Sequence, residues 1–248
     1  MRVFGSMMVA AAIAFAGVTG AGHHAEHSHW GYNGKAGPEH WGELDPKFRL
    51  CKEGVNQSPI DLNRFIEAKL PKLKITYAGN ARNVVNNGHT IKVETMGLNE
   101  VVIDGVPFRL QQFHFHTPSE NKINGKQFPM EAHFVHKSDK GDYLVIAVMF
   151  KEGEYNKALE KILNDLDPKV GNKKQLHEMF NPGDLFPRKL DYYRFVGSFT
   201  TPPCTEGVRW IVLKNPVTAS KEQLVKMHSI MGENNRPVQP LKARCILK

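Results

Sequence analysis

The chain of 248 residues contains few cysteines, no long apolar run beyond its N-terminus and no cluster of one charge. Three cysteines are too few for a disulfide-dominated miniprotein, and no stretch of 18 apolar residues follows position 25, which excludes a membrane-spanning helix in the mature chain. Because 41% of the residues are hydrophobic, the chain is neither disordered nor a low-complexity fibre. No repeat or linker divides it, so we expect one domain.

The basic excess is dispersed along the chain. Lys and Arg number 33 against 25 Asp and Glu, which gives a net charge of +8, and the longest run of cations is two residues, as at Lys173 and Lys174. No patch of cations interleaved with aromatic residues stands out. The sequence therefore predicts a solvated basic surface and no nucleic-acid partner.

The N-terminus shows the three parts of a secretory signal. Arg2 precedes an apolar stretch over residues 7–15 and then small residues, with cleavage expected after Ala16 or Ala21. This pattern predicts a signal peptide over residues 1–21, a His-rich tail over residues 22–29 and one folded domain over residues 30–248. We therefore expect a periplasmic or secreted protein.

Export changes the interpretation of the three cysteines, because an oxidising compartment allows two thiols to persist as a disulfide. Cys51, Cys204 and Cys245 permit three pairings, and each pairing leaves one thiol over. The residues alone do not choose between them.

Short runs rich in β-branched and aromatic residues predict a mainly β fold. The expected strands cover residues 73–77, 90–95, 101–103, 110–116, 131–136, 143–150 and 208–213. Asn-Gly and Asp-Gly dipeptides between them indicate mostly antiparallel hairpins. Helices are expected in only two places, after the N-cap residue Asn156 and after a capping box formed by Ser220 and Gln223. The fold class is thus mainly β with a few short helices.

Three histidines follow the period of two that is typical of strands. Gln112, His114 and His116 share one strand face, and the phenylalanines between them share the other. Residues 131–135 repeat this pattern around His133. If Asn124 and Gly125 close a two-residue hairpin, the residue numbers of each opposed pair add up to 249. His116 then lies directly across from His133. The sequence therefore predicts that three imidazoles converge at one point.

Three neutral imidazoles on a rigid sheet suit a Zn²⁺ ion whose fourth tetrahedral position stays open for water, as in catalytic sites. Gln112 and Glu131 each lie two residues before a predicted ligand on the same strand face. An oxygen from each could accept the second N–H of His114 and of His133, and so fix the orientation of both rings.

The sequence resembles the α-class carbonic anhydrases, in their bacterial exported branch, from about Trp30 to Ala243. The resemblance rests on the motifs at residues 56–60, 87–89, 112–116, 131–136, 197–204 and 235–240, in this order. It implies a single domain around a large, mostly antiparallel, ten-stranded twisted sheet with zinc in a conical cleft. It also implies the reversible hydration of CO₂ to bicarbonate and a proton by zinc-bound hydroxide.

The resemblance also assigns roles to individual residues. It implies zinc ligation by His114, His116 and His133, and support of these ligands by Gln112 and Glu131. Thr200 would accept the proton of the hydroxide while it donates to Glu120. The remaining expected roles are a Cys51–Cys204 disulfide, an apolar wall for CO₂ made of Val135, Val145, Phe199, Val208 and Trp210, and a water chain ordered by Tyr32, Asn87 and Thr201 that leads to the proton shuttle His89.

Two positions depart from the commoner family pattern. Phe199 replaces the more frequent Leu, and Lys92 stands where many members have Asn or Gln. Two alternative functions stay open. His114, His116 and Glu120 also fit a cupin metal motif, and the His-rich tail would suit a non-catalytic exported zinc-binding protein. The sequence leaves open whether the chain forms a homodimer.

Overall fold

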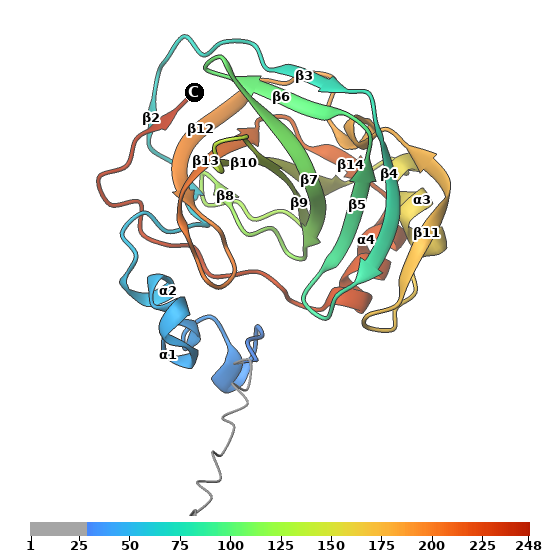
Figure 1. The fold of residues 1–248 in the computed structure, drawn as a ribbon, viewed down its shortest axis with the longest axis horizontal. Coiled ribbons are helices and arrows are strands. Elements are labelled where there is room, and N and C mark those ends of the chain that lie inside the picture. Colours follow the sequence, from blue (N-terminus) through green and yellow to red (C-terminus); the bar gives the residue numbers. More distant parts are fainter. Residues whose placement is uncertain (1–28) are drawn as a thin grey trace, which may run out of the picture.

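The computed structural model describes residues 29–248, which form a mostly β structure around one large twisted sheet (Figure 1). The predicted signal peptide and residues 22–28 of the predicted tail lie outside the described residues. Within residues 29–248, no helix combines the length and the apolar character needed to cross a membrane.

Thirteen strands form the main sheet, in the order β11-β4-β5-β7-β9-β10-β13-β12-β15-β2, with β3, β6 and β14 joined at its sides. Their bounds are β2 (Phe65–Ile66), β3 (Lys74–Tyr77), β4 (Asn80–Asn86), β5 (Ile91–Met96), β6 (Asn99–Ile103), β7 (Val106–His116), β9 (Met130–Lys137), β10 (Tyr143–Glu152), β11 (Lys173–Phe180), β12 (Tyr192–Ser198), β13 (Glu206–Leu213), β14 (Val217–Ala219) and β15 (Ile246–Leu247). A separate parallel pair joins β1 (Asp61–Leu62) to β8 (Lys122–Ile123).

The mainly β class and the mostly antiparallel sheet are confirmed, with a small correction to the strand number. Ten strands of the main sheet have four or more residues, and the short strands β2, β14 and β15 raise the total to thirteen. Strand β10 pairs in parallel with β13 and β14, and β15 pairs in parallel with β2. The expected number of ten came from the resemblance, and segments of two or three residues are too short to show alternation in the sequence.

Three longer strands were not predicted, namely β4, β11 and β12. Strand β11 buries only two of its eight side chains, and β4 contains three asparagines, a residue that is depleted in strands. Polar sequences of this kind resemble loops. Backbone pairing makes them strands: β4 forms a local hairpin with β5, whereas β11 pairs with β4 across a long stretch of chain, with Lys173 opposite Val85.

The pairing of β7 with β9 lies near the middle of the sheet and differs from the predicted register. His114, not His116, lies directly across from His133, and His116 lies across from Glu131. The predicted turn exists, since Ile123 bridges Lys126. The chain between the two strands does not continue this ladder, because β8 pairs with β1 instead. The register is therefore shifted by two residues, which leaves every side chain on its predicted face.

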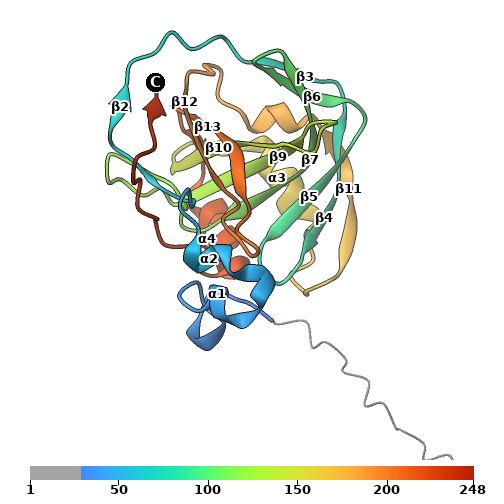
Figure 2. The same ribbon diagram turned by 60° about the vertical axis from the view of Figure 1, so that its left-hand side comes forward.

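Both expected helices are present and begin as predicted. The side chain of Asn156 accepts a hydrogen bond from Leu159 N and caps α3 (Lys157–Asp165). Ser220 and Gln223 form a reciprocal capping box at the start of α4 (Lys221–Met231). Two further one-turn helices, α1 (Trp41–Leu44) and α2 (Leu50–Glu53), lie together outside the sheet (Figure 2).

The sheet separates two apolar clusters, and β7 contributes to the boundary between them. Phe113 and Phe115 are fully buried in the larger cluster, together with the apolar face of α3. The rings of Phe113 and Phe134 stack with centroids 4.8 Å apart. The smaller cluster includes Val145 and Trp210. The alternating histidines of β7 therefore face away from the larger cluster.

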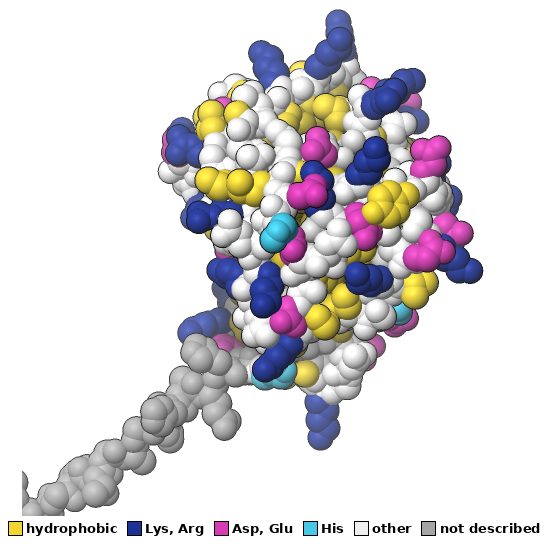
Figure 3. Space-filling model, turned by 90° about the vertical axis from the view of Figure 1, so that its right-hand side faces the viewer, with side chains coloured by type: hydrophobic (Ala, Val, Ile, Leu, Met, Phe, Trp, Pro, Cys, Tyr) yellow, Lys and Arg dark blue, Asp and Glu magenta, His cyan; other side chains and the backbone are white. Residues whose placement is uncertain are grey.

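Charged side chains are interspersed on the described surface. On the face in Figure 3, Lys and Arg lie among Asp and Glu side chains. This agrees with the dispersed basic residues of the sequence.

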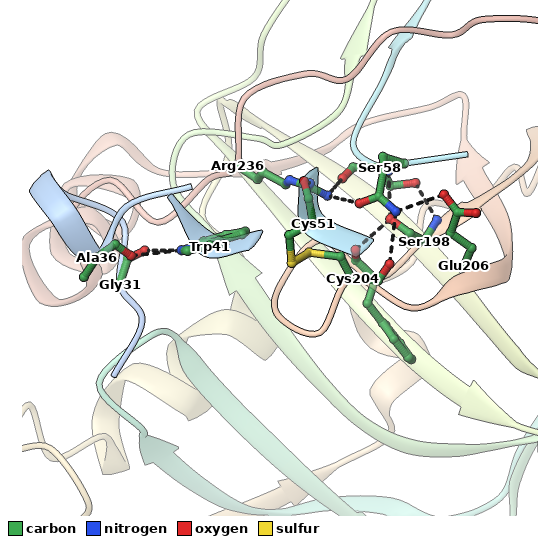
Figure 4. The surroundings of a disulfide bond; sticks show 11 residues. Gly31, Ala36, Trp41, Cys51, Ser58, Ser198, Cys204, Glu206 and Arg236 are labelled. Carbon is green, nitrogen blue, oxygen red and sulfur yellow. Dashed lines mark hydrogen bonds between the residues drawn. A yellow bond between two sulfur atoms is a disulfide. The ribbon is translucent and has the colours of Figure 1, made fainter. Parts of the chain in front are cut away.

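A disulfide joins Cys51 of α2 to Cys204 in the loop after β12, which confirms the pairing that the resemblance implied. Cys245 is exposed and unpaired. Buried polar groups contact the backbone of both cysteines. Arg236, which lies beside Cys51 in Figure 4, donates from Nη2 to the Cys51 carbonyl at 2.8 Å. Gln57 Nε2 donates to the Cys204 carbonyl at 3.1 Å. The disulfide thus connects the N-terminal helices to the loop between β12 and β13.

We predict that removal of this disulfide lowers the free energy of unfolding. The two cysteines are 153 positions apart. Closing so long a loop lowers the conformational entropy of the unfolded chain, which stabilises the folded state by at most about 4 to 5 kcal/mol. Urea unfolding of the double variant Cys51→Ser/Cys204→Ser should therefore show a large loss, whereas Cys245→Ser, which removes an exposed thiol, should unfold as the parent does. Equal stability of all three proteins would contradict the prediction.

Candidate metal centre

Three histidines from two neighbouring strands converge on one side of the sheet. His114 and His116 come from β7 and His133 from β9, and one nitrogen from each ring lies within 4.8 Å of the others. The imidazoles of His116 and His133 are buried, and that of His114 is partly exposed. The sheet therefore presents three potential ligand nitrogens to one point.

The second nitrogen of each ring faces an oxygen acceptor. His114 Nδ1 lies 2.9 Å from Gln112 Oε1, His116 Nδ1 lies 2.7 Å from the Asn234 carbonyl, and His133 Nε2 lies 2.9 Å from Glu131 Oε1. The acceptors at Nδ1 of His114 and of His116 fix the tautomer and orient both rings, and Glu131 Oε1 lies close enough to His133 Nε2 to accept its N–H. The nitrogens left for a ligand are then Nε2 of His114, Nε2 of His116 and Nδ1 of His133.

These nitrogens fit a divalent metal such as Zn²⁺. His116 Nε2 is buried and has no hydrogen-bond partner. Burial and the neighbouring imidazoles hold the pKa of His114 and of His133 well below its usual value, so both rings are neutral, as metal ligation requires. Among residues 29–248 no fourth His, Cys, Asp or Glu side chain joins this cluster. Three imidazole donors are the donor set of an open catalytic zinc site.

Glu131 is held by hydrogen bonds from the loop that follows β7. Its Oε2 accepts from the backbone N–H groups of Glu120 and Asn121, and its Oε1 accepts from Asn121 Nδ2 at 2.7 Å. Burial raises the pKa of Glu131 to about 7, against the effect of these hydrogen bonds. The carboxylate is thus fixed in position beside His133.

Glu120 lies between the histidines and two separate loops. Its Oε2 is 3.4 Å from His116 Nε2, and its Oε1 accepts from the backbone N–H of Arg236 at 2.8 Å. Burial raises the pKa of Glu120 well above its usual value, while hydrogen bonds from the Thr200 side chain and from Arg236 lower it. A cation held by the histidines would further favour the ionised form.

A cavity of about 280 Å³ opens in front of the histidines. Most of the predicted pocket residues line it, namely Val135, Val145, Phe199, Thr200, Thr201 and Trp210, together with Gln112, His114 and His133. Val208 is buried in the same apolar cluster and is not part of the lining. The lining therefore combines apolar side chains with imidazole and hydroxyl groups.

His89 lies at the tip of the hairpin between β4 and β5, half-buried against the N-terminal segment. Its ring stacks on Trp30 with centroids 3.8 Å apart, and the ring of His29 lies 6.2 Å away. Burial, with a smaller effect from His29, lowers the pKa of His89. The Asn87 side chain accepts from the backbone N–H groups of His89 and Thr90, both at 2.9 Å, and so shapes this tip.

Tyr32 and Lys92 approach the centre from two other segments. Burial, together with the charge of Glu120, raises the pKa of Tyr32, so its phenol stays neutral. Lys92 pairs with His114 in the ladder between β5 and β7, and its Nζ lies 3.6 Å from Glu94 Oε1.

The sequence did not indicate the roles of Asn234, Asn121 and Arg236. Their contacts with the centre join residues from 10 to 118 positions apart in the chain. Arg236 belongs to a motif of the resemblance, but no local pattern shows that its backbone N–H donates to Glu120.

Comparison with known proteins places this geometry in a family. Residues 36–248 match the family model described as eukaryotic-type carbonic anhydrase. A carbonic anhydrase of Pectobacterium carotovorum is 47% identical over 220 residues, which cover 88% of this chain and 90% of that protein. One of Neisseria gonorrhoeae is 47% identical over 227 residues, covering 91% and 90% respectively. The solved α-carbonic anhydrase of Thermovibrio ammonificans, in complex with the inhibitor sulfanilamide, superimposes with a TM-score of 0.87 at 52% identity, covering 89% of this chain and 99% of that one.

We predict that His133→Ala loses tightly bound zinc, because two imidazoles remain and Glu131 is left without the ring that it orients. Zinc content after dialysis against a weak chelator, measured by mass spectrometry, should fall from about one ion per chain to nearly none. His177→Ala, which removes an exposed histidine outside the cluster, should keep its zinc. A full equivalent of zinc in His133→Ala would exclude His133 as a ligand.

Proposed function

Because the chain belongs to the eukaryotic-type, or α, family of carbonic anhydrases, we propose how its residues perform the reversible hydration of CO₂ that this family catalyses. The observation that supports the proposal best is the cluster of three oriented imidazoles at an apolar-walled cavity. The cupin alternative is not supported, since the fold and the relatives are those of carbonic anhydrases. The same similarity argues against a zinc-binding protein without activity.

His114, His116 and His133 would hold Zn²⁺ through the three nitrogens that their hydrogen-bond acceptors leave available. Carbonic anhydrase is itself the standard example of the chemistry that zinc supplies when bound, a fall in the pKa of water from 15.7 to about 7 that provides hydroxide at neutral pH. Neutral ligands leave most of the positive charge on the metal, and the acceptors behind His114, His116 and His133 keep the rings from rotating.

Thr200 and Glu120 would orient the attacking hydroxide. With Zn²⁺ held by the histidines, the carboxylate of Glu120 would be ionised and would take the hydrogen bond of the Thr200 hydroxyl. The Thr200 oxygen would then be left to accept a hydrogen bond from the nucleophile and so to orient it toward the substrate carbon. Arg236 supports the arrangement because its backbone N–H occupies the other carboxylate oxygen.

The apolar wall of the cavity would receive CO₂. Val135, Val145 and Trp210 are almost fully buried, and Phe199 packs against Tyr143 with ring centroids 4.8 Å apart. A neutral linear molecule needs no charged partner, and an apolar wall binds the charged product bicarbonate less well. Val208 supports this wall from behind.

His89 would transfer the excess proton to solvent. Its half-buried ring lies at the surface end of a hairpin tip, and an imidazole changes charge near neutral pH. Tyr32, Asn87 and Thr201 would order the water molecules between the centre and His89. The disulfide supports the further proposal that the protein works in an oxidising compartment, in the periplasm or outside the cell.

We predict that Thr200→Val lowers kcat/KM for CO₂ by about 100-fold, because valine has the shape of threonine but neither donates to Glu120 nor accepts from the hydroxide. Stopped-flow CO₂ hydration measures this, and zinc content should stay at one ion per chain. Thr200→Ser retains the hydroxyl and should keep most of the activity. Comparable rates in the valine and serine variants would refute the orienting role.

A second prediction concerns the proton shuttle. His89→Ala should lower kcat most in dilute buffer, where proton export limits turnover, and should leave kcat/KM for CO₂ nearly unchanged because that constant reports the earlier attack step. Added imidazole should restore much of the rate, since a diffusing base can accept the same proton. Unaltered turnover in dilute buffer, or a loss that imidazole does not relieve, would place the shuttle elsewhere.

A further inference from the structure

The side chain of Asn234 is almost fully buried and all of its hydrogen-bonding groups are used. Its Oδ1 accepts from the backbone N–H of Thr117 at 2.7 Å. Its Nδ2 donates to the carbonyls of His89 and Phe115, both at 2.9 Å. In addition, the backbone carbonyl of Asn234 lies 2.7 Å from His116 Nδ1. One carboxamide therefore joins the segments on both sides of His116 to the backbone of His89.

The hairpin tip that contains His89 has no backbone pairing to β7. The ladder between β5 and β7 covers Lys92 to Glu94, opposite His114 to Gln112, and does not extend to His89. Beyond the end of the ladder, side-chain hydrogen bonds join the hairpin tip to β7. The Thr90 hydroxyl accepts from Phe115 N at 3.1 Å and donates to the Phe115 carbonyl at 2.6 Å. Among the described residues, Asn234 makes the one hydrogen bond that reaches the backbone of His89 from outside the hairpin tip.

We propose that the side chain of Asn234 is a positioning residue for proton transfer, which fixes the His89 backbone relative to the His116 backbone. This inference rests on the proposed function, in which His89 is the shuttle and His116 is a zinc ligand. Transfer of a proton along ordered water depends steeply on the placement of its acceptor, and a displacement of about 1 Å can lower a rate by as much as 100-fold. A single rigid group that holds both backbones limits such displacement.

The chemistry of the site requires a carboxamide. The position needs one acceptor for Thr117 and one nitrogen that donates to two carbonyls, His89 and Phe115. Aspartate has the same shape and keeps the acceptor, but its ionised carboxylate donates to neither carbonyl. Asn234→Asp therefore removes the link to His89 while it keeps the link to Thr117.

Asn99→Asp provides a matched control. Asn99 is also buried, at the start of β6; it accepts from Gly79 N at 3.1 Å and donates to the Met96 carbonyl at 3.2 Å, and neither partner is a proposed site residue. It makes the same kinds of backbone contact without contact to His89 or His116. A general loss of stability should thus affect both variants.

The first test measures position without turnover. Amide hydrogen exchange of His89 and Thr90, followed by NMR in the zinc-loaded proteins, should be faster by about fivefold or more in Asn234→Asp than in the parent, which corresponds to the contribution of about 1 kcal/mol from one hydrogen bond. Asn99→Asp should leave exchange at these two amides unchanged. Zinc content should be one ion per chain in both variants.

The second test measures turnover. In dilute buffer kcat of Asn234→Asp should fall by at least about threefold, with kcat/KM within about twofold of the parent and with rescue by imidazole. If Asn234 acts through His89, the double variant His89→Ala/Asn234→Asp should have the same kcat as His89→Ala alone. Asn99→Asp should have the kcat of the parent.

The outcomes separate the two proposals. If His89→Ala is defective while Asn234→Asp shows parental exchange and kcat, Asn234 has no positioning role. A joint fall of kcat and kcat/KM in Asn234→Asp, or losses that multiply in the double variant, would likewise refute it, because the residue would then act on the centre as a whole. Normal kcat of His89→Ala in dilute buffer would refute the shuttle itself, and with it this role of Asn234.

Discussion

The register between β7 and β9 is the constraint on which the centre depends. With His114 opposite His133 and His116 two residues along the same face, three imidazoles meet within 4.8 Å. A shift by one residue would turn His133 into the opposite apolar cluster. The stacked rings of Phe113 and Phe134 oppose such a shift, since they would have to leave a closely packed core. The same packing that stabilises the sheet therefore positions the ligands.

Orientation of the imidazoles requires contributions from distant segments. Gln112 and Glu131 belong to the same strands as the ligands, but the acceptor for His116 is the carbonyl of Asn234, which lies 118 positions away. Burying an imidazole N–H without an acceptor is unfavourable, so these contacts also stabilise the fold. The side chain of Asn234 also donates to the backbone carbonyl of His89. The position of the proposed zinc ligand His116 is thereby linked to the position of the proposed proton shuttle His89.

The loop with Thr200 and Thr201 is held on several sides at once. Cys204 joins it covalently to α2, Gln57 donates to the Cys204 carbonyl, and Cys204 N donates to the Thr201 carbonyl at 2.9 Å. Arg236 donates to the Cys51 carbonyl with its side chain and to Glu120 with its backbone. A loop fixed in this way can hold the Thr200 hydroxyl ready before substrate arrives, which is how an active site avoids reorganisation during the reaction.

The sequence by itself determined the alternation of His114, His116 and their neighbouring phenylalanines, the helix caps at Asn156 and Ser220, and through its motifs the family and the disulfide. Only the tertiary structure decided the register, the polar strands β4 and β11, the stacking of Trp30 on His89 and the role of Asn234. The reason is physical. Alternation has a period of two, so it fixes which face a side chain takes but not which of two registers is formed. Contacts between residues more than 100 positions apart leave no periodic pattern in the chain, because they arise only when the whole sheet has folded.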